Sequence, residues 1–171
     1  MSLTTFPVNH PLPLNGSDTE RDAFWMRHAL TLAEKAARMN EVPVGAIVVL
    51  GDEIIGEGFN SPICQNDPTA HAEMIAIRKA AEKISNYRLP DAELYVTLEP
   101  CNMCAGAMVH ARIKRLVYGA TESKAGAIVS KLALLDQAFL NHKVQHTGGI
   151  LAKECSTLLS NFFRDKRLSE T

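Results

Sequence analysis

Two short stretches of the sequence carry the side chains that could do chemistry. The first, PTAHAEM, contains His71 and Glu73, and the second, LEPCNMC, contains Cys101 and Cys104 in a C-x-x-C arrangement. Imidazole and thiolate groups are common zinc ligands in proteins, and C-x-x-C is a frequent two-ligand unit. One histidine and two cysteines make three ligands, which is the number found in catalytic zinc sites with an open fourth position.

A helix start beside each stretch favours a metal site. Pro100 suits the first position of a helix, where unpaired N–H groups and the positive end of the helix dipole stabilise cysteine thiolates. Pro68 and Thr69 predict another helix start just ahead of His71. Residues two apart on a helix point roughly 200° apart, so His71 and Glu73 can converge only at its N-terminal end. There Glu73 could move protons between a metal-activated water and a substrate.

Other interpretations of these residues stay open. His71 alone could be a histidine at a helix start, and Cys101 with Cys104 alone could be a redox pair. Cys64 or Cys155 could complete a closed Cys₃His structural site, but both lack a partner at ligand spacing, and we expect ordinary buried or loop thiols. The joint pattern of H-A-E and P-C-x-x-C favours a catalytic metal site. The remaining histidines occur singly and are not expected to bind metal: His10, His28, His110, His142 and His146.

The composition is that of an ordinary globular chain. With 171 residues, 46% hydrophobic and 22% charged, it suits one domain that needs no disulfide or metal merely to fold. No apolar run approaches the roughly 18 residues of a membrane span, and the N-terminus lacks the pattern of a secretory signal. We therefore expect a cytoplasmic protein with no membrane contact, whose four cysteines are thiols or ligands.

Charge is distributed unevenly along the chain. Residues 1–100 carry 8 Lys and Arg against 14 Asp and Glu, whereas residues 101–171 carry 10 against 5. Such asymmetry points to a polyanionic partner for one surface. The alternative is that the two halves of the sequence do not correspond to separate faces of the folded domain.

The elements that must position the site follow from local patterns. Ser17 and Glu20 form a capping box, which predicts a helix after it. VPVGAIVVL and EIIGEGF flank Gly51 and Asp52, which predicts a hairpin with a type II′ turn. The other expected elements are a loop over 60–67, a helix over 70–84, a strand over 93–98, a helix over 102–111, a strand over 115–120, a short helix over 128–135, a strand over 143–147 and a helix over 151–167.

These elements predict an α/β fold. Residues 1–17, rich in Pro with Asn, Gly and Ser, are expected to form a mobile tail, and residues 18–168 a single domain. Strands that alternate with helices predict a sheet covered on both faces. The opening hairpin makes this five-stranded sheet mixed rather than wholly parallel.

H-x-E followed by P-C-x-x-C is the signature of the zinc-dependent cytidine deaminase-like superfamily. The stretches VPVGAI, IGEGFN, DPTAHAE, LYVTLEPC and MCAGAM, with the terminal FFR, resemble the bacterial tRNA-specific adenosine deaminases over about residues 22–167. The resemblance implies a three-layer α/β/α fold, a homodimer and one Zn²⁺ per subunit. It implies hydrolytic deamination of adenosine to inosine at the wobble position, with the tRNA anticodon stem-loop as partner.

The resemblance also implies residue roles. His71, Cys101 and Cys104 would bind zinc, and a zinc-bound hydroxide would attack C6 of adenine with Glu73 as proton shuttle. Asn60 resembles a base-contacting asparagine, and Val44 would line the pocket. The substrate contacts that the resemblance implies are Asn60, Val44, Ala72, Glu122, Phe162, Phe163 and Arg164.

Three details of these contacts depend on how the chain folds. Glu122 stands where family members often carry aspartate, in a loop near the RNA sugar. Phe162 and Phe163 are adjacent on the terminal helix, about 100° apart, so we expect one ring to pack while the other meets RNA. Additional positive charge for the RNA is expected from Arg112, Lys114 and Arg115.

Two rival functions remain at this point. The same zinc chemistry serves deaminases of a free nucleobase or nucleoside, such as guanine or cytosine, and the ligands do not separate these from an RNA enzyme. The other rival is a non-catalytic, zinc-stabilised RNA-binding module. Glu73 argues against that module, because a structural site has no use for a carboxylate that is not a ligand.

Overall fold

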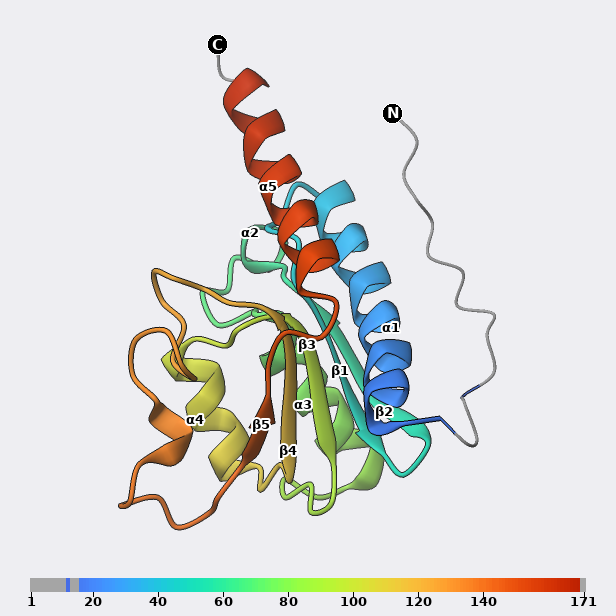
Figure 1. Ribbon diagram of the computed structural model, residues 1–171, viewed down its shortest axis with the longest axis vertical. Helices are drawn as coiled ribbons and strands as arrows, with labels where there is room; N and C mark the ends of the chain where they lie inside the picture. The colour runs from blue at the N-terminus through green and yellow to red at the C-terminus, as the bar shows by residue number, and fades with distance from the viewer. Residues whose placement is uncertain (1–11, 13–15, 170–171) are drawn as a thin grey trace.

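The computed structural model describes residues 12 and 16–169. Among them, five strands form one sheet, with five α-helices and one 3-10 helix around it (Figure 1). The elements are α1 Asp18–Arg38, β1 Gly45–Leu50, β2 Glu53–Phe59, α2 Pro62–Gln65, α3 Ala72–Ile84, β3 Glu93–Leu98, α4 Asn102–His110, β4 Arg115–Ala120, η1 Leu134–Asp136, β5 Gln145–Thr147 and α5 Ala152–Ser169. The expected tail over 1–17 lies outside the described residues, except for Leu12, Gly16 and Ser17.

The strands lie in the order β2-β1-β3-β4-β5. β1 runs antiparallel to β2 and β3, whereas β3, β4 and β5 are parallel to one another. This confirms the mixed five-stranded α/β sheet. Leu98 pairs with Ala120, so the carboxyl ends of β3 and β4 meet at the same edge, which is where open α/β sheets bind their ligands.

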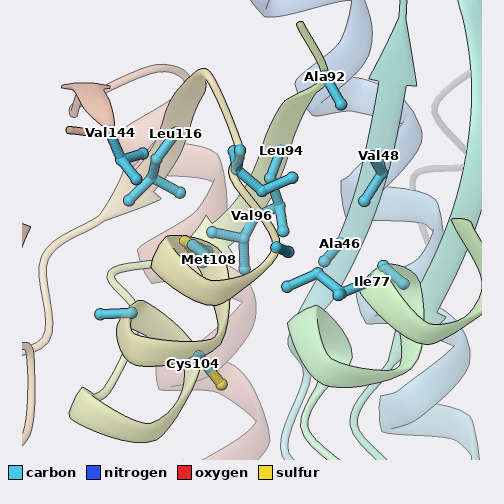
Figure 2. Packing of buried hydrophobic residues seen from close by; sticks show 14 of the residues in the cluster. Ala46, Val48, Ile77, Ala92, Leu94, Val96, Cys104, Met108, Leu116 and Val144 are labelled. Atoms are coloured by element: carbon cyan, nitrogen blue, oxygen red, sulfur yellow. The ribbon is translucent and has the colours of Figure 1, made fainter. Parts of the chain in front are cut away.

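Helices cover both faces of the sheet (Figure 1). Side chains alternate between faces along β1: Ala46 and Val48 join the core beneath α3 and α4, whereas Ile47 and Val49 join a second core with α1 and α5. Figure 2 shows the first core, in which Cys104 belongs to α4 and packs within the same apolar cluster as Val96. The fold therefore has three layers, and one side chain of the expected metal site is part of its core.

Local chemistry explains where the first elements begin and turn. The Ser17 hydroxyl accepts a hydrogen bond from the Glu20 N–H at 3.3 Å, and the Glu20 carboxylate accepts one from the Ser17 N–H at 2.7 Å. This is the expected capping box at the start of α1. Gly51 has φ 63° between β1 and β2, which agrees with the expected type II′ turn.

Two glycines of β2 let α3 approach the sheet directly. A Cβ atom on Gly58 would lie 2.2 Å from the carbonyl oxygen of Ala72, and one on Gly56 would lie 2.2 Å from that of Ala76. No side chain larger than hydrogen fits at such distances. These contacts set the first turn of α3, which carries the H-A-E motif, against the sheet.

The predicted helix over 128–135 was wrong. Residues 127–130 form turns, and the only helical structure in the predicted range is the start of η1, at Leu134. The backbone N–H groups of Ile128, Val129 and Ser130 all donate to the carboxylate of Glu99 instead of entering a helix. The predicted loop over 60–67 also differs, because it contains the short helix α2. The last strand begins two residues later than expected, at Gln145.

A buried polar network joins α1 to the sheet. Asp22 is 2% exposed, and it accepts hydrogen bonds from Arg115 at 2.7 Å and from the Tyr95 hydroxyl at 3.0 Å. Arg21 and Arg115 both donate to Glu93. The expectation that Arg115 supplies charge to RNA was therefore wrong, because its guanidinium is paired inside this network.

Within the described part of the chain, no helix is long and apolar enough to cross a membrane.

Candidate metal centre and active site

The expected metal ligands lie at two helix starts. His71 is the N-cap of α3 and Cys101 is the N-cap of α4, both with extended backbone. Neither side chain makes a capping hydrogen bond to its own helix, so each is available to another partner. Cys104 lies in the first turn of α4. The proposed ligands therefore lie at the N-terminal ends of two helices, as expected from the sequence.

The three side chains come together in space. His71 Nδ1 lies 3.6 Å from Cys101 Sγ and 3.6 Å from Cys104 Sγ, and all three ligand atoms lie within 4.8 Å of one another. Over residues 12 and 16–169, this is the one cluster of three or more His, Cys, Asp or Glu side chains that could hold a metal. Cys64 is exposed, Cys155 is buried, and both lie outside the cluster, as expected.

The spacing of the donors fits a tetrahedral zinc ion. Zn–S bonds of about 2.3 Å and Zn–N bonds of about 2.0–2.1 Å place the nitrogen and sulfur ligands of such an ion about 3.6 Å apart. This is the separation of His71 Nδ1 from each sulfur. One imidazole with two thiolates is also a donor set that zinc prefers.

Without metal, the pKa values of the Cys101 and Cys104 thiols are shifted in opposite directions. Hydrogen bonds from Cys104 and His71 lower the pKa of the Cys101 thiol. The same interaction with Cys101, together with burial, raises the pKa of the Cys104 thiol. Cys101 therefore loses its proton more readily than Cys104, and a metal that binds both sulfurs as thiolates displaces the protons that remain on them.

Glu73 lies beside this cluster without belonging to it. It is the second residue of α3, and it is 4% exposed. Burial raises the pKa of its carboxyl group to about 7, against the opposing effects of a backbone hydrogen bond and of His71. A carboxyl group whose pKa is near neutrality can both accept and donate a proton at working pH.

Three of the expected substrate residues lie at the same helix start. The side-chain oxygen of Asn60 accepts a hydrogen bond from the Ala72 N–H at 2.9 Å, and the Asn60 N–H donates to the Val44 carbonyl at 3.0 Å. Val44, Asn60 and Ala72 are therefore adjacent to one another and to Glu73, which follows Ala72 in α3. Val44 and Ala72 are buried, and Asn60 is half-buried.

Glu122 lies in the loop after β4. Its N–H donates to Glu99 at 2.9 Å, and its own side chain accepts a hydrogen bond from the Lys124 N–H at 2.8 Å. This loop follows the strand parallel to β3, so it lies at the sheet edge where the chain continues to Cys101. The Glu122 side chain is thus held in a compact turn.

The aromatic and basic residues of α5 lie apart from the metal cluster. Phe162 is half-buried with Lys166 over its ring at 5.5 Å, whereas Phe163 is 44% exposed. Phe162 is thus less exposed than Phe163, and the expectation that one ring packs while the other meets RNA stays a prediction. Phe162 and Arg164 line a groove of about 490 Å³ between α1 and α5. Figure 1 shows α5 extending past the sheet from this region.

Two buried carboxylates near the site were missed from the sequence. Glu99 directly precedes the Pro-Cys pair and is 2% exposed. Glu41 is equally buried and accepts a hydrogen bond from the Cys64 N–H at 2.7 Å, at the start of α2. An acidic residue between the end of β3 and the Pro-Cys pair was the available signal for Glu99. No local pattern signalled Glu41, because its partner is 23 residues away.

Comparison with known proteins agrees with this geometry. A family model described as MafB19-like deaminase matches residues 20–167. The tRNA-specific adenosine deaminase of Haemophilus influenzae is 55% identical over 150 residues, which cover 87% of each chain. This chain belongs to the tRNA-specific adenosine deaminase family. The family member of Bacillus subtilis is 41% identical over 86% of this chain and 91% of its own.

Solved structures show the same relationship. A structure from work on A-to-I editing by tRNA:A34 deaminases at the wobble position superimposes with a TM-score of 0.77 at 43% identity, covering 79% of this chain and 98% of that one. A guanine deaminase of Nitrosomonas europaea superimposes with a TM-score of 0.70 at 23% identity, covering 91% and 89%. At that identity the guanine deaminase shares the fold alone with this member of the tRNA-specific family.

Proposed function

We propose that this protein hydrolyses adenosine to inosine at the wobble position of a tRNA anticodon. The observation that carries the proposal is the cluster of His71, Cys101 and Cys104, with the buried Glu73 beside it as a carboxyl group that is not part of the cluster. Membership of the tRNA-specific adenosine deaminase family supports the choice of adenosine in tRNA as substrate.

The proposed cofactor is one Zn²⁺ ion per subunit, bound by His71 through Nδ1 and by Cys101 and Cys104 through their sulfurs. The distances between these atoms support this assignment. When bound, zinc supplies the activation of a water molecule at neutral pH. Three protein donors leave room for that water.

Glu73 carries the protons in the proposed reaction. It accepts a proton as the water oxygen bonds to C6 of adenine, and it delivers this proton to N1. It then accepts the remaining hydroxyl proton and passes it to the amino group, which leaves as ammonia. Water and adenosine are thereby converted to inosine and ammonia, and Glu73 returns to its starting state. A pKa near neutrality supports both directions of transfer.

The proposed base pocket lies where Val44, Asn60 and Ala72 meet. The target base must leave its stack to enter, which an unpaired anticodon loop allows at little cost. On α5, the open ring of Phe163 and the guanidinium of Arg164 are suited to stack on loop bases and to bind phosphate. Glu122 is proposed to lie near the ribose of the RNA.

A homodimer in the cytoplasm completes the proposal, and it rests on the family resemblance. The mass in solution should then be about twice the 18.7 kDa of one chain. Multi-angle light scattering measures this mass directly, and a single-chain mass at micromolar concentration would contradict the dimer.

The runner-up is a deaminase of a free nucleobase or nucleoside, because a guanine deaminase shares the fold. One experiment separates it from the proposal. The zinc-loaded protein is incubated with an anticodon stem-loop that carries adenosine at the wobble position, and separately with free adenosine, adenine, guanine and cytosine. We expect inosine only in the stem-loop. Turnover of the free compounds alone would overturn the proposed function.

A further inference from the structure

The carboxylate of Glu99 gathers hydrogen bonds from a distant loop. Its Oε1 accepts from the N–H groups of Ile128 at 3.1 Å, Val129 at 2.8 Å and Ser130 at 2.9 Å. Its Oε2 accepts from the N–H of Glu122 at 2.9 Å and from the Ser130 hydroxyl. All five donors belong to residues 121–131, which we call the rim loop.

The loop and the carboxylate depend on each other. A carboxylate accepts hydrogen bonds on both oxygens, and four backbone N–H groups, which can only donate, face this one. Successive backbone N–H groups that converge on one point form an anion-binding concavity. The carboxylate is 2% exposed, so the rim loop replaces the water that it loses on burial.

Two further contacts press the rim loop onto the same segment. The Ala127 N–H donates to the Pro100 carbonyl at 2.8 Å. A Cβ atom on Gly126 would lie 2.4 Å from Glu99 Cδ, so the loop backbone passes directly over the carboxyl group. Glu99 and Pro100 immediately precede Cys101, and the rim loop therefore borders the chain that carries a proposed zinc ligand.

The position of the rim loop gives this arrangement a role. β3 and β4 are parallel, so the segments that leave their carboxyl ends lie side by side at the edge where α/β sheets bind substrates. The rim loop contains Glu122, whose backbone N–H is one of the donors to Glu99. Moving the loop would displace Glu122, and the hydrogen bonds that tie the loop down go to Glu99 and Pro100 rather than to a proposed ligand or Glu73.

We propose that Glu99 is a positioning residue for the substrate: it holds the rim loop, and with it Glu122, in the conformation that borders the RNA. This inference rests on the proposed function, since it names a determinant of RNA binding at the same site. Glu99 itself touches neither metal nor base in this scheme; it acts through the loop.

The first test is Glu99→Gln in the zinc-loaded protein. Glutamine keeps the size of the side chain but turns one acceptor oxygen into an NH₂ donor that faces the loop N–H groups. We expect hydrogen exchange at the amides of Glu122, Ile128, Val129 and Ser130 to accelerate about tenfold or more, the factor for one lost charge-assisted hydrogen bond. The KM for the anticodon stem-loop should rise about as much, while kcat and zinc content change little.

Two more variants separate positioning from general stability. Glu93→Gln removes a carboxylate at the start of β3, the end of the strand opposite to Glu99, and should leave rim-loop exchange and KM at the wild-type values. Gly126→Ala pushes the loop off Glu99 while keeping the carboxylate, and should reproduce the Glu99→Gln changes. Gly126→Ala also provides the test if Glu99→Gln does not fold.

The inference is overturned if rim-loop exchange is unchanged in both Glu99→Gln and Gly126→Ala. It is also overturned if exchange accelerates while KM stays at the wild-type value, or if zinc is lost with the loop still protected. Should the wild-type protein deaminate no RNA, the proposed function fails separately. The dissociation constant for the stem-loop, measured by fluorescence anisotropy, then replaces KM, and a value unchanged by both variants overturns the role of Glu99.

Discussion

At the scale of single residues, His71 and Cys101 are N-cap residues whose side chains do not cap their own helices. N-cap residues commonly satisfy the free N–H groups of their own helix, but these two make no capping hydrogen bond. Their side chains face each other instead, with Cys104 one turn further along α4. The helix starts thereby contribute donors and a positive field to one small volume.

Glu73→Gln tests the proton-shuttle role. Glutamine has nearly the same volume and cannot carry a proton, so we expect turnover of the anticodon stem-loop to fall by about 10²- to 10⁴-fold. The zinc content should stay at one ion per chain, because Glu73 lies outside the ligand cluster. Single-turnover kinetics and elemental analysis measure the two quantities. Wild-type turnover by the variant would contradict the role.

At the scale of elements, short sequence patterns predicted those features that are stabilised by contacts between residues close in the sequence. Ser17 and Glu20 are three residues apart, and their capping box was readable directly. The failed helix over 128–135 depends on Glu99, about 30 residues away, and the pairing of Arg115 depends on Asp22, 93 residues away. The spacing of residues along the sequence does not indicate partners that lie this far apart in it. The ligand cluster was predictable because each helix start carried its own chemical signature.

Gly58→Ala tests the close approach of α3 to β2. The added methyl group would lie 2.2 Å from the Ala72 carbonyl oxygen, with the Ala76 N atom 2.8 Å away, so α3 must move. We expect a loss of about 1–3 kcal/mol in the free energy of unfolding, together with reduced turnover, because α3 carries His71 and Glu73. Urea denaturation measures the first effect.

Gly106→Ala is the matched control for this prediction. Apart from its chain neighbours and the backbone of its own helix, no described atom lies within 4 Å of the added Cβ. Alanine favours the helix, so stability should stay equal or rise by up to about 1 kcal/mol. Equal stability losses in the two variants would contradict the packing argument.

At the scale of the whole molecule, α1 is joined to the sheet by charge as well as by apolar packing. Asp22 and Tyr95 are almost wholly buried, and Arg115 reaches Asp22 through two hydrogen bonds. Arg115, from the basic second part of the chain, therefore pairs inside the fold with Asp22 and Glu93 from the acidic first part. This internal pairing accounts for one of the positive charges of the second part.

Asp22→Ala tests the pairing of Asp22 with Arg115 between α1 and the sheet. Removing one partner leaves Arg115 half-buried without its strongest acceptor, and we expect a loss of about 3–5 kcal/mol in the free energy of unfolding. Turnover per folded molecule should stay unchanged, since the network lies away from the ligand cluster. Asp52→Ala is the control: Asp52 is an exposed partner of Arg21 at 3.9 Å, and its loss should change stability by about 1 kcal/mol or less. A comparable effect of both variants would contradict the buried role of Asp22.

The number of sulfur atoms bound to each zinc ion tests the central claim most directly. X-ray absorption spectroscopy of the zinc-loaded protein counts them. The account predicts two sulfurs per zinc, from Cys101 and Cys104, with the count unchanged in Cys64→Ser and in Cys155→Ser. A third sulfur, or loss of zinc in either of these variants, would show a closed structural site and would contradict a catalytic centre.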